Sequence, residues 1–157
     1  IGTMTYYDPE SGSFGALGHG ITDLDTAQHM SLGSGPIMET TVKAVKKGEK
    51  GDPGELKGDF SVQRDVGTVT VNSDGGIFGT VSDASFPAQG QAVPVASADE
   101  VTTGRAVIRT TVCGDEIREY EVQIVKVYRD EDSTRNLLLR ITDPELLQTT
   151  GGIVQGM

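Results

Sequence analysis

The sequence predicts a mostly β protein, a sandwich or barrel, and three observations support this fold class. Short runs rich in β-branched residues recur between turn signals along the chain. Glycine supplies 21 of the 157 residues without a collagen-like period, which suits turns and close backbone approaches. The sequence has no long amphipathic helical pattern. A chain of this length corresponds to about one domain, so we expect a single domain over residues 1–157.

In the first half of the chain, each expected strand ends at residues that favour turns. Asp8-Pro9-Glu10-Ser11-Gly12 closes the first strand, and Asn72-Ser73-Asp74-Gly75-Gly76 is typical of a hairpin turn. The run over 37–47 alternates loosely and contains β-branched residues, which favours a strand. The strands expected in this half cover residues 2–7, 13–17, 37–47, 56–62, 67–71 and 76–81.

In the second half, strands are expected over 105–112, 117–128 and 137–141, with a tight turn at Gly114-Asp115 between the first two. The consecutive apolar residues near Val125 predict that at least one of these strands is buried on both faces. Asp143-Pro144 predicts the start of a short helix, which Gly151-Gly152 would end. The segment 82–104 separates the two groups of strands, and we expect it to be the crossover between two halves of a double barrel.

Composition and charge exclude several classes of function. The net charge of −10 argues against nucleic acid, because phosphate binding requires a concentrated positive surface. No apolar run is long enough to cross a bilayer, and no signal peptide is visible. The single Cys113 excludes an internal disulfide and CxxC zinc motifs. We therefore expect no nucleic-acid partner, no membrane segment in this chain, no metal and no cofactor.

The chain has two histidines, and only one has a context that suggests chemistry. His19 lies between two glycines after an apolar strand, where a loop histidine can reach a cleft or can simply be a surface or capping residue. His29 has no such context and is expected to be an exposed loop residue. Cys113 could act as a thiolate with His19, but neighbouring carboxylates would disfavour the thiolate, so a small structural residue is the better interpretation.

Two further positions have both a structural and a catalytic interpretation. Asp143 before Pro144 is better explained as an ordinary helix N-cap, and the alternative is the carboxylate that orients a general-base histidine. The glycines at 151, 152 and 156 could form a frayed terminus. They could also allow backbone N–H groups to point at a developing oxyanion.

Taken in order, the motifs at 2–6, 14–23, 51–58 and 142–157 resemble the SpoIVB peptidase family, serine endopeptidases of endospore-forming bacteria. The stretches 16–19 and 151–157 are the most specific of them. The resemblance implies that His19 is the general base and Asp143 the third catalytic residue. It places the nucleophilic serine directly after Met157, with Gly156 contributing to the oxyanion hole. The implied fold is a trypsin-like double β-barrel whose final C-terminal strands are absent from this chain.

The spacing of these residues departs from the trypsin-like pattern. The chain order of histidine, aspartate and serine agrees, but 124 positions separate His19 from Asp143 and only 15 would separate Asp143 from the serine. The alternative carboxylate partners for His19 are Asp23, Asp25 and Asp59. Because the serine is missing, we expect this chain alone to be inactive, and self-cleavage after Met157, a truncated chain and an unseen continuation all fit.

The resemblance implies a peptidase that cleaves a protein substrate in sporulation signalling. The expected location is secreted or extracytoplasmic, in the intermembrane space of the developing spore. If the chain cuts itself, its own C-terminal segment would be a retained partner. The alternative is a catalytically inactive β-barrel that binds a partner protein or peptide by strand addition. A cysteine hydrolase using Cys113 is a third, weaker hypothesis.

Overall fold

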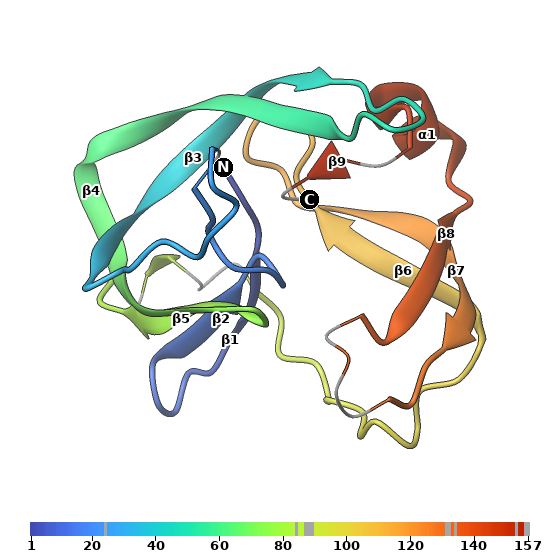
Figure 1. The fold of residues 1–157 in the computed structure, drawn as a ribbon, viewed down its shortest axis with the longest axis horizontal. Helices are drawn as coiled ribbons and strands as arrows, with labels where there is room; N and C mark the ends of the chain where they lie inside the picture. The colour runs from blue at the N-terminus through green and yellow to red at the C-terminus, as the bar shows by residue number, and fades with distance from the viewer. Residues whose placement is uncertain are drawn as a thin grey trace. The chain divides into compact units, whose positions relative to one another are not determined.

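The computed structural model describes residues 1–23, 25–83, 85–86, 90–130, 133, 135–152 and 154–155 (Figure 1). Strands account for 51% of the chain and helix for 6%, which confirms the expectation of a mostly β protein. In the described residues the strands form two sheets, and neither sheet closes into a barrel. The elements are β1 (Met4–Tyr7), β2 (Ser13–Ala16), β3 (Gly35–Lys46), β4 (Gly54–Ser73), β5 (Gly76–Val81), β6 (Gly104–Thr110), β7 (Arg118–Val127), β8 (Leu137–Ile141), α1 (Pro144–Thr150) and β9 (Val154–Gln155).

The chain divides into two compact units, which are described separately. Unit 1 comprises Ile1–Thr41 and Gly58–Gln91, and unit 2 comprises Val42–Lys57 and Ala92–Gln155. One sheet has the strand order β1-β2-β5-β4-β3 with β9 paired to β4, and the other has the order β6-β7-β8. The boundary after Gln91 falls inside the segment 82–104, whose role as a barrel crossover stays a prediction.

The core of unit 1 lies on β2, β4 and β5. Phe14 and Ala16 of β2 are buried together with Val69 of β4 and Ile77 of β5. The three strands are antiparallel neighbours, so these side chains come from adjacent positions of one sheet. Burying such a cluster stabilises the sheet by roughly 1.5–3 kcal/mol for each large apolar side chain.

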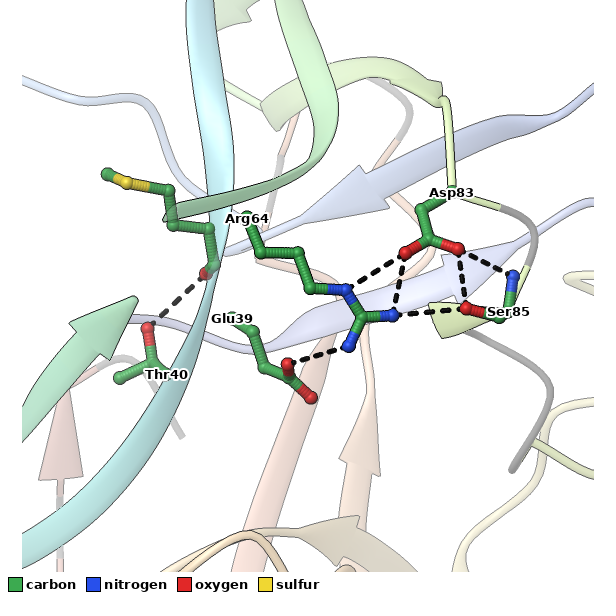
Figure 2. Close-up of polar contacts among 6 residues, drawn as sticks. Glu39, Thr40, Arg64, Asp83 and Ser85 are labelled. Atoms are coloured by element: carbon green, nitrogen blue, oxygen red, sulfur yellow. Dashed lines mark hydrogen bonds and ion pairs between the residues drawn. The ribbon is translucent and has the colours of Figure 1, made fainter. Parts of the chain in front are cut away.

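A polar network on the surface of unit 1 holds the chain directly after β5 (Figure 2). The Arg64 guanidinium donates to Asp83 Oδ2 from Nη2 at 2.6 Å and from Nε at 3.0 Å. It also donates to Glu39 Oε2 at 3.2 Å and to Ser85 Oγ at 3.0 Å. Hydrogen bonds from Ser85, together with Arg64, lower the pKa of Asp83 to about 2. The network therefore ties the start of the segment 82–104 to β3 and β4.

The second sheet, in unit 2, buries one face and exposes the other. In Figure 1 the strands β6, β7 and β8 lie side by side. Tyr120 and Val122 of β7 are buried, whereas Val107 of β6 is 55% exposed. The prediction of a strand buried on both faces was therefore wrong. The pairing of β7 with β8 has a register shift between Ile124 and Lys126. A bulge changes the direction in which successive side chains point, so the consecutive apolar residues Ile124 and Val125 do not indicate a strand buried on both faces.

Helix α1 and strand β9 close unit 2. Leu146 of α1 is fully buried against Tyr120 and Val112. Val154 of β9 packs with Val42 and Leu56, and β9 pairs in parallel with the start of β4. In the described part of the chain, no helix is long and apolar enough to span a membrane.

Two features of the topology differ from the sequence prediction. The strands expected over 56–62 and 67–71 are parts of the single 20-residue strand β4. The intervening residues extend the strand because Val66 is fully buried and its carbonyl accepts from Ser82 N and Asp83 N. Strand β9 was not predicted, because its pairing partner Gly54 lies about a hundred residues earlier in the sequence.

Candidate active site

The loop that carries His19 begins with a sharp turn at the end of β2. Leu17 has φ of 72° and Gly18 has φ of 68°, so two consecutive residues adopt the left-handed region. For a leucine this conformation costs of the order of 1–3 kcal/mol. The Leu17 side chain packs against the unit 1 core, which offsets that cost. The turn leaves His19 exposed beyond the end of the strand.

The His19 ring makes a hydrogen bond that fixes its tautomer. Its Nδ1 lies 2.9 Å from the carbonyl oxygen of Gly20. A carbonyl can only accept, so Nδ1 must carry the hydrogen, and the Nε2 of the neutral ring then holds the lone pair. This is the tautomer in which a histidine accepts a proton at Nε2, as a general base of a serine hydrolase does. Local backbone geometry therefore prepares His19 to take a proton.

The segment after His19 is held by the turn between β4 and β5. Asn72 Oδ1 accepts from Ile21 N at 2.8 Å, and its Nδ2 donates to the carbonyls of Ile21 at 2.9 Å and Met30 at 3.0 Å. A Cβ at Gly20 would lie 2.7 Å from the Ser73 carbonyl oxygen, so only glycine allows this approach. Sequence reasoning recognised Asn72 only as a turn residue, and no local signal indicates its contacts with this loop.

His29 is an exposed loop residue, as the sequence predicts, and its side chain pairs with a carboxylate. Its Nε2 donates to Asp74 Oδ1 at 2.9 Å, and its backbone forms a bridge with Thr22. Both side chains of the pair lie at the surface, with 40% and 86% of their area exposed. The pair connects the loop 20–30 to the turn that follows β4, two residues after Asn72. Its evident role is to hold the loop in place.

Three aspartates are alternative carboxylate partners for His19, and the structure gives their surroundings. Asp23 Oδ1 accepts from Asp25 N, Thr26 N and Thr26 Oγ1, and these bonds, those from Thr26 first, lower the pKa of Asp23. Asp59 lies in β4. In the described residues, neither Asp23 nor Asp25 forms a hydrogen bond with the His19 ring. Within unit 1 the Gly20 carbonyl therefore takes the hydrogen-bonding place that a triad carboxylate would occupy.

Asp143 has the capping geometry that its sequence context predicts. Its Oδ1 accepts from Leu146 N at 2.9 Å, and Pro144 occupies the first turn of α1. Its own N–H donates to the Glu121 carbonyl at 3.1 Å. Asp143 belongs to unit 2 and His19 to unit 1, so a pairing of the two stays a prediction.

The polar surroundings of Asp143 come from β7 and from α1 itself. Arg118 donates from Nη1 to Glu145 Oε1 at 2.8 Å and also pairs with Glu116. Burial raises the pKa of Tyr120, the Glu145 carboxylate raises it further, and Arg118 lowers it. Asp143 is one of the carboxylates that raise the pKa of Tyr120, which places it near the buried phenol.

The glycine-rich segment before the expected serine is anchored up to Gln155. Gly151 ends α1 with φ of 72°, and its N–H donates to the Leu147 carbonyl. Gly48 N donates to the Thr150 carbonyl at 2.7 Å, which fastens the helix end to the loop after β3. Strand β9 then follows, so the interpretation as a frayed terminus was wrong for Val154–Gln155. Gly156 and Met157 lie outside the described residues, so the oxyanion role of Gly156 stays a prediction.

The other candidate groups have simpler surroundings. Cys113 is exposed in the loop between β6 and β7 of unit 2, where the neighbouring Gly114 pairs with Val42. In the described part of the chain, no cluster of three or more histidine, cysteine, aspartate or glutamate side chains has the geometry to hold a metal ion.

Comparison with known proteins gives one finding about the whole chain. The family model described as SpoIVB peptidase S55 matches residues 1–157. No curated protein and no solved structure matches the chain. The match therefore covers both units and all of the candidate residues, including those that the structure does not describe.

Proposed function

The chain belongs to the SpoIVB peptidase S55 family, and from this premise we propose that it is the major part of a serine endopeptidase domain in which His19 is the general base. The observation that carries the proposal is the hydrogen bond from His19 Nδ1 to the Gly20 carbonyl, which leaves Nε2 as an exposed proton acceptor. The nucleophile is a serine expected directly after Met157. Family membership supports a protein substrate.

The proposed reaction follows the general course of serine peptidases. His19 Nε2 removes the proton from the serine hydroxyl as its oxygen bonds to the scissile carbonyl carbon. The oxyanion of the tetrahedral intermediate is held by the N–H groups of Gly156 and the serine. The imidazolium then gives its proton to the departing amine. Asp143 would stabilise the imidazolium if it reaches the ring, and the Gly20 carbonyl supports the same tautomer without it.

The family also supports the wider biological proposals. They are a signalling role in sporulation, an extracytoplasmic site of action in the developing spore, and a trypsin-like double barrel completed by strands that follow the serine.

The test uses the full-length protein, the serine included, and the two histidines as a matched pair. We expect His19→Ala to abolish labelling of the serine by a fluorophosphonate probe and to lower peptidase turnover by about a millionfold. His29→Ala, the control, is expected to retain labelling, because the His29 side chain pairs with the exposed Asp74 carboxylate and its backbone bridge with Thr22 does not depend on the side chain. Full labelling of the His19→Ala protein would reject the proposed base. Retained activity in Cys113→Ala is expected and would exclude the cysteine hydrolase.

A second candidate function is binding of an extended peptide by strand addition. Strand β8 lies at the edge of its sheet, and its three leucines are 45–47% exposed, which leaves a strand that another chain can pair with. This function requires no catalytic base, so His19→Ala should leave peptide binding unchanged. Binding measured by fluorescence anisotropy, beside turnover on the same peptide, separates the two functions.

A further inference from the structure

We propose that Asn72 is a positioning residue that orients the His19 imidazole through the peptide bond between Gly20 and Ile21. The inference rests on the proposed function, since it assigns a catalytic consequence to the orientation of His19. Asn72 touches neither the ring nor any reacting atom. It acts through a backbone group that the ring contacts directly.

One peptide unit links the two side chains. Its carbonyl, from Gly20, accepts from His19 Nδ1 at 2.9 Å, and its N–H, from Ile21, donates to Asn72 Oδ1 at 2.8 Å. The C=O and N–H of a trans peptide point in opposite directions within one plane. The Asn72 side-chain amide holds the Ile21 N–H and therefore also fixes the direction of the Gly20 carbonyl. The position of the His19 imidazole, which bonds to that carbonyl, is fixed as a result.

Both the oxygen and the nitrogen of the Asn72 side-chain amide form hydrogen bonds, so the orientation of the amide is unambiguous. Besides accepting from Ile21 N, it donates from Nδ2 to the carbonyls of Ile21 and Met30. An amide turned by 180° would oppose donor to donor and acceptor to acceptor. The three bonds clamp both ends of the loop 21–30 to the end of β4.

The hydrogen bonds through the Gly20–Ile21 peptide restrict an exposed histidine that could otherwise change its orientation. The His19 side chain lies at the surface, where a ring can rotate and exchange tautomers. A catalytic base requires one tautomer and one direction, and small misplacements are costly to the rate. The peptide held by Asn72 supplies both, and successive hydrogen bonds polarise one another, which strengthens the contact with Nδ1.

Asn72→Asp is the sharpest variant, because it keeps the size of the side chain. The carboxylate loses both donated bonds and faces the carbonyl oxygens of Ile21 and Met30, and this repulsion displaces it from the position in which Asn72 Oδ1 accepts from Ile21 N. The matched control is Asn136→Asp, the same chemical change at the only other asparagine, which is exposed in unit 2. Thermal unfolding of both proteins checks that they remain folded at the temperature of the measurements.

The first readout is the tautomer of His19, measured by ¹⁵N NMR of the imidazole rings and independent of activity. The chain has only two histidines, and His29→Gln identifies their signals. We expect the Nδ1–H tautomer of His19 in the wild type and in Asn136→Asp, and a shift toward Nε2–H in Asn72→Asp. All spectra are recorded at one and the same alkaline pH, so that a difference in protonation is not mistaken for a change of tautomer. An unchanged His19 tautomer in Asn72→Asp would overturn the proposal.

The second readout is turnover of the full-length protein. We expect Asn72→Asp to lower kcat by about 10- to 100-fold with little change in KM, because the base is misplaced while the substrate contacts remain. A loss that appears only in KM would contradict the inference. If His19→Ala keeps its activity while the tautomer of His19 shifts in Asn72→Asp, the proposed function fails. The inference that Asn72 orients His19 through the Gly20–Ile21 peptide is then still supported.

A second variant keeps the proposal testable if Asn72→Asp does not fold. Gly20→Ala leaves Asn72 intact but places a Cβ 2.7 Å from the Ser73 carbonyl oxygen and 2.8 Å from His29 Cε1. The same peptide unit should then move, and the His19 tautomer should shift as in Asn72→Asp. A folded Gly20→Ala protein with the wild-type tautomer and wild-type kcat would overturn the proposal.

Discussion

At the scale of single residues, backbone groups and the half-buried amide of Asn72 hold the His19 ring and the loop that follows it. The ring bonds to a carbonyl of the next residue, and the peptide unit of that carbonyl is fixed by Asn72, 51 positions from Ile21 in the sequence. Elsewhere in unit 1, Arg64 plays a comparable part by holding the chain after β5 through Asp83. Each of these groups makes several bonds at once, so a conservative substitution can test each one.

The Asp83 carboxylate gives a prediction about pH. Its pKa in the folded protein is about 2, below the value of 3.8 for an unperturbed aspartate, so it stabilises the folded state above about pH 4. That contribution is lost as the pH falls from about 4 to 2, where the folded protein must also take up the proton. We expect the difference in Tm between the wild type and Asp83→Asn to be constant above about pH 4 and to shrink below it. A difference in Tm that stays constant from pH 7 down to about pH 2 would contradict the prediction.

At the scale of elements, the cap of helix α1 can be tested separately from the catalytic role proposed for the same residue. Asp143 caps the helix through Leu146 N, and Gly151 ends the helix in the left-handed conformation. Family membership adds a proposed catalytic role for the same carboxylate. An asparagine at this position still accepts from Leu146 N but carries no charge, so capping and catalysis can be tested independently.

We expect Asp143→Asn to leave the free energy of unfolding nearly unchanged and Asp143→Ala to lower it by about 1 kcal/mol. If Asp143 also stabilises the imidazolium, Asp143→Asn should lower kcat of the full-length protein by about tenfold or more, because the negative charge is lost while the Gly20 carbonyl still holds the tautomer. Denaturant unfolding and turnover of the same three proteins provide the measurements. Wild-type turnover in Asp143→Asn would assign Asp143 to the helix cap alone.

At the scale of the whole molecule, the two compact units do not follow the order of the chain. Residues 42–57 of β3, β4 and their loop belong to unit 2 although the rest of the N-terminal half belongs to unit 1. They pack there with Val154, and Val45 contacts the cluster that includes Leu146. The chain near Val95, which joins the two halves of the sequence, lies outside the strands and helix, and Val95 is 93% exposed. The core of unit 2 therefore depends on both halves of the sequence.

Limited proteolysis tests this arrangement. We expect an elastase-type protease, which cuts after small side chains, to cleave first in the exposed segment 90–97. The two fragments should then elute together in size-exclusion chromatography and separate only in denaturant, because residues 42–57 remain packed in unit 2. Ala16 and Ala106 lie within strands and provide an internal control, since cleavage there should be slow. Fragments that separate without denaturant would contradict the prediction.

The sequence predicted the elements whose signals are local. Asp143-Pro144 and Gly151 mark the start and end of α1 as observed, and the strands 76–81 and 137–141 have the predicted bounds. The motifs also indicated the family, which the match over residues 1–157 confirms, whereas the role of His19 as its general base stays a prediction. Prediction failed where pairing is distant in sequence, at β9 and in the continuous strand β4, because the hydrogen-bonding partner and not the local composition decides whether such residues form a strand.

The mostly β class, the cap of α1 and the family all follow from signals in the amino-acid sequence. Only the tertiary structure decided what holds His19: the left-handed turn at Leu17, the Gly20 carbonyl on Nδ1, and Asn72 behind the same peptide. The physical reason is that capping and turn preferences act over a few residues. The hydrogen bonds of Asn72, in contrast, form only after β4 and β5 have folded into a sheet and brought their turn against the loop.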